Sequence, residues 1–290
     1  MNILSFDIED WCFEKSLVEE YDRMLQEILD ILDARQMKAT FFCLGRMVEE
    51  FPRVIKQIHA HGHEIGCHSQ SHKWLKKMSY EECLEDTRKS VDLLEQCVGE
   101  KVESYRAPAF SVGPNNCWAF EVLERCGIIR DSSVYPSTHA VGGFPDFGAL
   151  EPAKVVYGST QMKEFPIAMT QIFGKKMAYS GGGYFRFFPL MYMRYVMNHS
   201  NYAISYLHLT DLVPEKKAFK SRKEYEAYYR EPGTITARAK RYFRSNVGKK
   251  GAWKKFQKLV NAEDFVSLKE ADGIIDWDKA RQVVLSSTKS

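Results

Sequence analysis

An alternation of short apolar strands with amphipathic helices is the feature that most constrains the fold of this 290-residue chain. Within residues 1–130 the alternation occurs four times, and helices end at Gly62, Gly99 and Gly127, where glycine suits the left-handed position after a helix. This pattern predicts a parallel α/β architecture. No Gly-x-Gly-x-x-Gly follows the first strand, which argues against a dinucleotide-binding fold. We therefore expect a barrel.

The expected elements are short. The predicted strands cover residues 3–6, 39–43, 63–67, 102–106, 128–129 and 201–209. The predicted helices cover residues 17–32, 48–61 and 79–99. Ser79 and Glu82 have the spacing of a capping box. Residues 142–189 carry few helix signals, and we predict two units, a barrel domain over 1–212 and a C-terminal extension over 213–290 that packs on it.

The net charge hides a strongly basic segment. The chain has 41 Lys and Arg against 38 Asp and Glu, whereas residues 215–258 have 15 against 4. Aromatic residues are interleaved with these charges, namely Tyr225, Tyr228, Tyr229, Tyr242, Phe243 and Trp253. The segment is therefore expected to contact an anionic membrane surface or a diphosphate-linked sugar lipid. The alternative is a solvated helical appendage whose aromatics pack on the acidic remainder. No motif favours nucleic acid as a partner.

Cysteine usage and hydropathy suggest a location. The seven cysteines include no Cys-x-x-Cys pair, and the first residues form neither a basic region nor a long apolar stretch. No run of 18 apolar residues occurs, so a membrane span is not expected. We expect reduced thiols, no signal peptide and a cytoplasmic protein.

Polar clusters follow two of the predicted strands, where parallel α/β proteins place their chemistry. Asp7, Glu9 and Asp10 follow the first strand and would repel one another without a cation or a base. His68 and His72 follow the third strand and can meet one cation if the segment turns helically. One carboxylate and two imidazoles form an open site of the catalytic zinc type. The alternatives are solvent-exposed histidines and carboxylates at a helix N-terminus.

Three further polar residues lie at strand ends. Arg106 follows the fourth strand and can hold a carboxylate in its ionised state, although a surface arginine before a turn is the alternative. His208 ends an apolar strand, where a histidine is more often a satisfied core group than a catalyst. Asp131 follows residues 128–129 and can orient His208, the alternative being a helix or turn cap.

Together these motifs resemble the polysaccharide deacetylase family, carbohydrate esterase family 4, over roughly residues 3–210. The segments that carry the resemblance are Ser-Phe-Asp-Ile-Glu-Asp (5–10), His-Ser-Gln-Ser-His (68–72), Arg-Ala-Pro (106–108), Asp-Ser-Ser (131–133) and Leu-His (207–208). Gly-Gly-Gly-Tyr-Phe-Arg-Phe-Phe-Pro (181–189) resembles a sub-branch associated with exopolysaccharide and surface-polysaccharide assembly. The resemblance implies an irregular (β/α) barrel, here with a basic, mainly helical C-terminal appendage.

The resemblance also implies a divalent metal, most simply Zn²⁺. His68 and His72 match the metal ligands of the family. The family's first motif has two adjacent aspartates, whereas here Asp7 is separated from the pair Glu9 and Asp10. Strand alternation favours Glu9 as the third ligand, and a turn directly after the strand would favour Asp10.

The remaining roles are implied in the same way. Asp7 matches the catalytic base and Arg106 the residue that tunes it, while His208 matches the general acid and Asp131 the partner of that acid. The backbone N–H of Ala109 is expected to bind the oxyanion of the reaction.

The substrate site is expected to include Ala109 and Phe110, the family's aromatic residue after the proline being displaced by one position. The expected reaction is removal of acetyl from an N-acetylated saccharide in a surface polysaccharide or its precursor, including a lipid-linked one. Two other functions fit the same residues: a non-haem iron oxygenase, which uses two histidines and a carboxylate, and a non-catalytic glycan-binding module. Oxygen consumption would identify the first, and sugar binding without acetate release the second.

Overall fold

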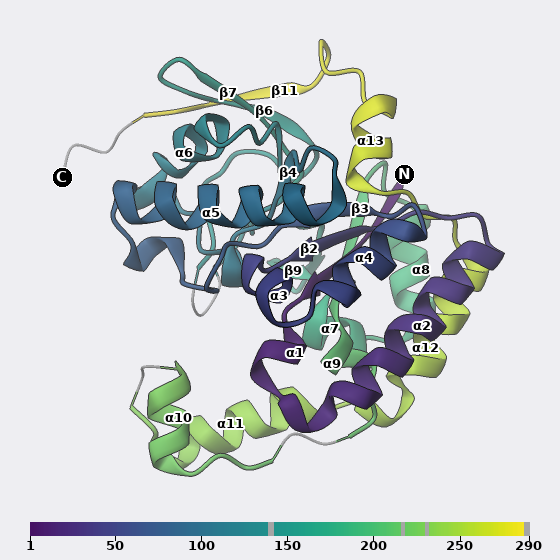
Figure 1. Cartoon of the computed structure of the whole chain (residues 1–290). Helices are drawn as coiled ribbons and strands as arrows, with labels where there is room; N and C mark the ends of the chain where they lie inside the picture. Colours follow the sequence, from purple (N-terminus) through teal and green to yellow (C-terminus); the bar gives the residue numbers. More distant parts are fainter. Residues whose placement is uncertain (139–141, 216–217, 230–231, 287–290) are drawn as a thin grey trace.

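A computed structural model describes residues 1–138, 142–215, 218–229 and 232–286 (Figure 1). Its main sheet has nine strands in the order β10-β1-β2-β3-β4-β5-β7-β6-β11, and β8 and β9 form a separate hairpin. The pairs from β10 to β7 are parallel, and β7 pairs with β6 in the antiparallel sense. The strands are β1 (Asn2–Ile8), β2 (Thr40–Cys43), β3 (Glu64–Cys67), β4 (Ser104–Tyr105), β5 (Arg130–Asp131), β6 (Ala153–Tyr157), β7 (Thr160–Glu164), β8 (Met169–Ile172), β9 (Lys175–Ala178), β10 (Ala203–His208) and β11 (Arg281–Leu285).

Helices surround this sheet, and α10 and α11 extend away from it at the lower left of Figure 1. The helices are α1 (Asp10–Phe13), α2 (Val18–Ala34), α3 (Gly45–Glu50), α4 (Pro52–Ala60), α5 (Tyr80–Val98), α6 (Ala119–Arg125), α7 (Gly182–Phe187), α8 (Leu190–Asn198), α9 (Leu209–Leu212), α10 (Arg222–Tyr229), α11 (Ile235–Asn246), α12 (Lys249–Ala262) and α13 (Leu268–Ile274). The basic segment 215–258 is therefore mainly helical, as predicted. Lys216, Lys217, Arg230 and Glu231 lie outside the described residues.

Local signals placed most elements of the first half correctly. The capping box of Ser79 and Glu82 starts α5, and Gly99 ends it at φ 75°. The single helix predicted over 48–61 is two helices, because Pro52 begins a new one at α4. The strand predicted at 128–129 lies two residues later, at Arg130–Asp131.

The sheet curls into the predicted irregular barrel. Three strand spacings separate β1 from β4, about 14 Å in a flat sheet, yet Arg106 Nη1 lies 2.8 Å from Asp7 Oδ1. Six spacings separate β10 from β7, about 29 Å if flat, yet the Tyr202 hydroxyl donates to Pro166 O at 2.7 Å. Only a strongly curved sheet allows both contacts.

Successive side chains of β1 point alternately into the barrel and toward the helices around it. Asp7 faces inward, whereas Phe6 stacks on Phe41 with ring centroids 4.9 Å apart and meets Phe256 of α12 at 5.9 Å. All three rings are fully buried. Helix α12 therefore covers the outer face of β1 and belongs to the main core, although it lies in the basic segment.

The residues after 212 make further contacts with the barrel. Val266 exchanges backbone hydrogen bonds with β1, and β11 pairs in parallel with β6. The division into 1–212 and 213–290 stays a prediction. Within the described ranges, no helix has the length and hydropathy needed to cross a membrane.

Replacing Phe256 tests the packing of α12 on β1. Phe256→Ala should lower the free energy of unfolding by about 3–5 kcal/mol, because it empties a closed aromatic site. Phe243→Ala on α11 is the matched control, since that ring is 66% exposed, and it should change stability by no more than about 0.5 kcal/mol. Urea unfolding measures both, and equal losses would contradict the described packing.

Candidate active site

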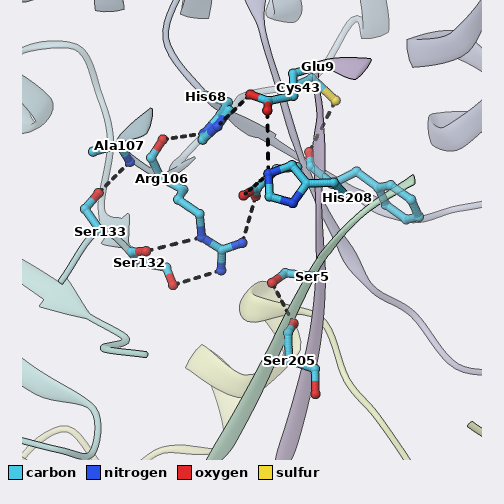
Figure 2. Close-up of polar contacts among 12 residues, drawn as sticks. Ser5, Glu9, Cys43, His68, Arg106, Ala107, Ser132, Ser133, Ser205 and His208 are labelled. Carbon is cyan, nitrogen blue, oxygen red and sulfur yellow. Dashed lines mark hydrogen bonds and ion pairs between the residues drawn. The ribbon is translucent and has the colours of Figure 1, made fainter. Parts of the chain in front are cut away.

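Asp7 and Arg106 form a buried ion pair at the carboxyl ends of the barrel strands. Figure 2 shows Arg106 with its contacts to Ser132. Asp7 is one residue from the end of β1, and Arg106 directly follows β4. Arg106 Nη1 donates to Asp7 Oδ1 at 2.8 Å, and its other nitrogens donate to Ser132, Nε to the carbonyl oxygen at 3.3 Å and Nη2 to Oγ at 3.1 Å. The guanidinium also lies 4.2 Å from the centre of the Phe42 ring. These contacts place a positive charge beside Asp7 without access to water.

Glu9, His68 and His72 converge beside this pair. One ligand atom from each lies within 4.8 Å of the others. Glu9 Oε2 is 2.7 Å from His72 Nε2 and 3.5 Å from His68 Nε2. His68 Nδ1 lies 2.7 Å from Arg106 O and donates to it, which fixes the ring with Nε2 toward the carboxylate. Two imidazole nitrogens and a carboxylate oxygen that converge in this way are the donor set of a divalent metal site.

The loop that carries the two histidines is not the helical turn that we expected. Ser69 and His72 have φ angles of 69° and 57°, in the left-handed region, and the loop leaves β3 irregularly. Asp86 of α5 holds it, accepting hydrogen bonds from the Gln70 N–H at 2.8 Å and the Ser71 hydroxyl at 2.6 Å. The two imidazoles are therefore brought together by a strained loop that Asp86 holds in place, and not by helical spacing.

Between the two carboxylates considered as third ligand, the geometry places Glu9 at the histidines. Burial would raise the pKa of Glu9, but His72, His68 and His208 together hold it well below its usual range. Asp10 points elsewhere: its Oδ2 accepts from the Thr210 N–H at 3.1 Å. A divalent cation fits Glu9, His68 and His72.

Arg106 contacts Oδ1 of Asp7, and His208 lies near the other oxygen, Oδ2. His208 is the Cα partner of Asp7 across the β1–β10 pair, and its Nε2 is 3.7 Å from Asp7 Oδ2 and 3.5 Å from Glu9 Oε1. Its Nδ1 lies 3.2 Å from Asp211 Oδ2. Burial lowers the pKa of His208, but its contact with Asp211 and the charges of Glu9 and Asp7 outweigh this and raise it to about 10. In the absence of a cation the imidazole is therefore protonated.

Asp131 is not brought to His208. It is the Cα partner of Glu164 across the β5–β7 pair, and its Oδ1 accepts from the Ser133 hydroxyl at 2.5 Å. Burial and the neighbouring Asp131 raise the pKa of Glu164 well above its usual value, and burial raises the pKa of Asp131. Ser133 in turn accepts from the Ala107 N–H, which ties Asp131 to the loop after Arg106.

The loop expected to bind substrate lies beside the site. Ala109 and Phe110 have φ angles of 55° and 50°, so the backbone turns sharply after Pro108. Phe110 is buried, with its ring 4.9 Å from Tyr206 and 5.9 Å from Tyr135. Ala109 is half-buried. The substrate-binding roles of both residues stay predictions.

A cleft of about 220 Å³ opens from the site. Its walls come from both ends of the chain and are formed by Glu9, Asp10, Phe13, Glu14, Arg186, His208, Thr210, Asp211, Lys220, Ser245 and Lys249. Our sequence reasoning missed Asp211 and Arg186. The spacing of His208 and Asp211, three residues apart at a strand end, was a usable signal, because such residues meet on a helical turn.

Comparison with known proteins identifies two regions. Residues 3–127 match the family model described as polysaccharide deacetylase, and residues 132–272 match a domain of unknown function, DUF3473. Residues 3–127 are thus similar to polysaccharide deacetylases, and residues 132–272 are similar to a DUF3473 domain. A possible metal site at Glu9, His68 and His72 agrees with a family that includes metal-dependent N-deacetylases.

Curated relatives match parts of the chain. A peptidoglycan-N-acetylglucosamine deacetylase of Bacillus cereus is 36% identical over 96 residues, 33% of this chain and 35% of that protein. The peptidoglycan-N-acetylmuramic acid deacetylase PdaC of Bacillus subtilis is 34% identical over 82 residues, 28% of this chain and 18% of that protein. The chain thus spans about a third or less of the curated relatives that it matches.

Solved structures are similar in fold over nearly the whole chain. A protein of Mycobacterium smegmatis assigned to the polysaccharide deacetylases aligns with a TM-score of 0.63 at 14% identity, covering 97% of this chain and 92% of that one. BA3943 of Bacillus anthracis, a family 4 pseudoenzyme, aligns with a TM-score of 0.50 at 16% identity, covering 98% of this chain and 69% of that one. At these identities the likeness concerns the fold.

Exchanging the two adjacent acids tests which of them belongs to the metal site. Glu9→Gln should weaken Zn²⁺ binding more than about 100-fold, since losing even an outer partner of a ligand costs about 10–100-fold. Asp10→Asn should keep full metal content, because its carboxylate lies on Thr210. Calorimetric titration and elemental analysis after dialysis measure both variants. Metal loss in Asp10→Asn alone would assign the third ligand to Asp10.

Proposed function

We propose that the protein is a divalent-metal-dependent N-deacetylase that releases acetate from an N-acetylated sugar. One observation carries the proposal: Glu9, His68 and His72 converge on one point, and His208 Nε2 lies 3.5 Å from Glu9 Oε1 and 3.7 Å from Asp7 Oδ2. A metal site with a base and an acid beside it is what hydrolysis of an acetamide requires.

The base is Asp7. A divalent cation bound at Glu9, His68 and His72 would polarise the acetamide carbonyl and lower the pKa of a bound water. Asp7 accepts the water proton at Oδ2, the oxygen that faces His208, while its Oδ1 stays on Arg106. The N–H of Ala109 is the proposed donor to the oxyanion.

The acid is His208. The departing amine is a poor leaving group, so the C–N bond breaks only as a proton reaches the nitrogen, and His208 Nε2 delivers it. Asp211 holds the other ring nitrogen at 3.2 Å and fixes the ring orientation. We therefore assign the orienting role to Asp211, and give Asp131 the role of supporting the loop after Arg106 through Ser133.

The substrate we propose is a surface polysaccharide or its precursor, including a lipid-linked one. Two observations support an acetylated glycan: the family match over 3–127 and curated relatives named for peptidoglycan deacetylation. The motif at 181–189 supports the surface-polysaccharide sub-branch. Two imidazoles and one carboxylate support Zn²⁺ as the metal. Seven free cysteines, five of them buried, support a cytoplasmic location.

Asp7→Asn tests the reaction. It should lower acetate release from N-acetylglucosamine oligosaccharides by about 10²–10⁴-fold, because the base is lost, while Zn²⁺ content is unchanged. Asp264→Asn, on an exposed acid paired with Arg35, is the matched control and should keep full activity. Thermal unfolding checks that each variant is folded.

Other outcomes of this assay would overturn the proposal. Equal turnover by metal-stripped and metal-loaded protein would remove the metal from the mechanism. Oxygen-dependent consumption of a co-substrate would indicate the oxygenase. Saccharide binding without acetate release from any N-acetylated sugar would indicate a binding module.

We further propose that helix α11 contacts an anionic membrane surface. The alternative was that the aromatics of the basic segment pack on the barrel, and α12 does so through Phe256. None of the residues of α11 is buried. Ile235 is 62% exposed and Phe243 66% exposed, and with Ala239 they repeat every four residues, which places them on one face. Lys240 and Arg244 are exposed on the same helix.

This surface is close to the cleft. Ser245 and Lys249, at the end of α11 and the start of α12, line the same cleft as Glu9 and His208. An apolar stripe flanked by cations suits the boundary between anionic headgroups and acyl chains. Seated there, α11 would bring the mouth of the barrel to a lipid-linked saccharide.

Vesicle binding tests this surface. The protein should sediment with vesicles of phosphatidylglycerol and phosphatidylcholine, and Phe243→Ser should weaken binding about tenfold, as expected for losing one inserted ring. Phe173→Ser, on a fully exposed ring at the tip of the β8–β9 hairpin, is the matched control and should bind normally. Equal binding by Phe243→Ser, or no sedimentation of the unmodified protein, would reject the proposal.

A further inference from the structure

Arg186 connects the His208 partner to the end of helix α11. It lies on α7 and is only 7% exposed. Its Nε is 3.1 Å from Asp211 Oδ1. Nη1 donates to Ser245 O at 2.6 Å and Val247 O at 3.3 Å, and Nη2 donates to Arg244 O at 3.0 Å. The carbonyl oxygens at a helix C-terminus carry partial negative charge. The positive charge of Arg186 is therefore balanced by Asp211 on one side and by these oxygens on the other.

Asp211 divides its two oxygens between Arg186 and His208. Oδ1 faces the guanidinium, and Oδ2 faces His208, accepting its backbone N–H at 3.1 Å and lying 3.2 Å from its Nδ1. The ion pair at Oδ1 and the hydrogen bond at Oδ2 restrict rotation of this carboxylate. The orientation of the imidazole is therefore set by a chain of contacts that begins at α11.

Tight backbone approaches on both sides hold Arg186 in place. A Cβ at Gly181 would lie 2.0 Å from the ring of Tyr206, two residues before His208. Gly248, at φ +73°, would place a Cβ 2.4 Å from Arg186 O. Lys255 of α12 donates to three carbonyl oxygens at the end of α7 at 2.9–3.0 Å. The glycine run at 181–183 thus lets α7 approach β10 closely enough for Arg186 to reach Asp211.

We infer that Arg186 is the positioning residue of the general acid, and that completing the acid half of the site is a function of the DUF3473 region. Residues 3–127 hold Asp7, Arg106 and the metal-site residues, whereas residues 132–272 hold His208, Asp211 and the α11 end that binds Arg186. The inference rests on the proposed function, because it assigns Arg186 through the acid role of His208.

Two substrates separate positioning from mere stability. Arg186→Gln should lower kcat on an N-acetylglucosamine oligosaccharide by about 10–100-fold with little change in KM, since a misplaced acid forfeits part of its 10²–10⁴-fold contribution. Hydrolysis of 4-nitrophenyl acetate should change by less than about twofold, because a nitrophenolate departs without a proton from the enzyme. Zn²⁺ content should be unchanged.

Matched variants sharpen the test. Arg194→Gln, on an α8 arginine 2.6 Å from Glu263 Oε1, should behave as the unmodified protein on both substrates. Arg186→Lys keeps the charge but cannot reach all the carbonyls, so its activity should be intermediate. Arg186→Gln combined with Asp211→Asn should be no slower than Asp211→Asn alone, because both break one chain of contacts.

A measurement without turnover separates failure of this inference from failure of the proposed function. The measurement is imidazole ¹⁵N NMR of the metal-free protein, in which the His208 signals are those that disappear in His208→Gln. The His208 Nδ1 signal should shift in Arg186→Gln and stay unchanged in Arg194→Gln. An unchanged signal would overturn the inference even if the protein is a deacetylase. Equal losses on both substrates, with loss of Zn²⁺ or of thermal stability, would overturn it in favour of a structural role.

Discussion

The buried contact between Arg106 and Asp7 joins the parts of the barrel mouth on which the site depends. The guanidinium is closed off from water, and removing either partner would leave an uncompensated buried charge, at a cost of about 3–5 kcal/mol. The carbonyl of the same arginine orients His68, and the next N–H is held by Ser133. One residue after β4 therefore sets the base, one imidazole and the start of the following loop.

Much of the fold and part of the site could be predicted from the sequence, because local patterns encode them. Apolar periodicity, the Ser79 capping box and terminal glycines predicted the helices, and all of these are local signals. Parallel strands collect their carboxyl ends at one edge, which was enough to expect Asp7 near His68 and His72. Alternation along β1 favoured Glu9 over Asp10, and the structure places Glu9 at the histidines.

Other parts depend on contacts that no local pattern encodes. The 68–72 segment has the spacing of a helical turn but is drawn into a strained loop by Asp86, a residue of the helix that follows. Asp131 and Asp211 are both acids near strand ends, and only the strand order decides which one meets His208: β5 pairs with β7, while Asp211 lies one turn beyond β10. Arg186 was not predicted because three of its contacts are with backbone carbonyls, which every residue type provides.

The pairing of β1 with β10 has a consequence for how the protein is made. The first strand leaves the ribosome about 200 residues before its neighbour on one side is synthesised. Until then β1 presents an open, largely apolar edge, the kind of surface that invites association with other nascent chains. Closing a loop of that length also slows folding. Production of the protein is thus expected to be sensitive to chaperone supply, and fragments that end before β10 should be prone to aggregate.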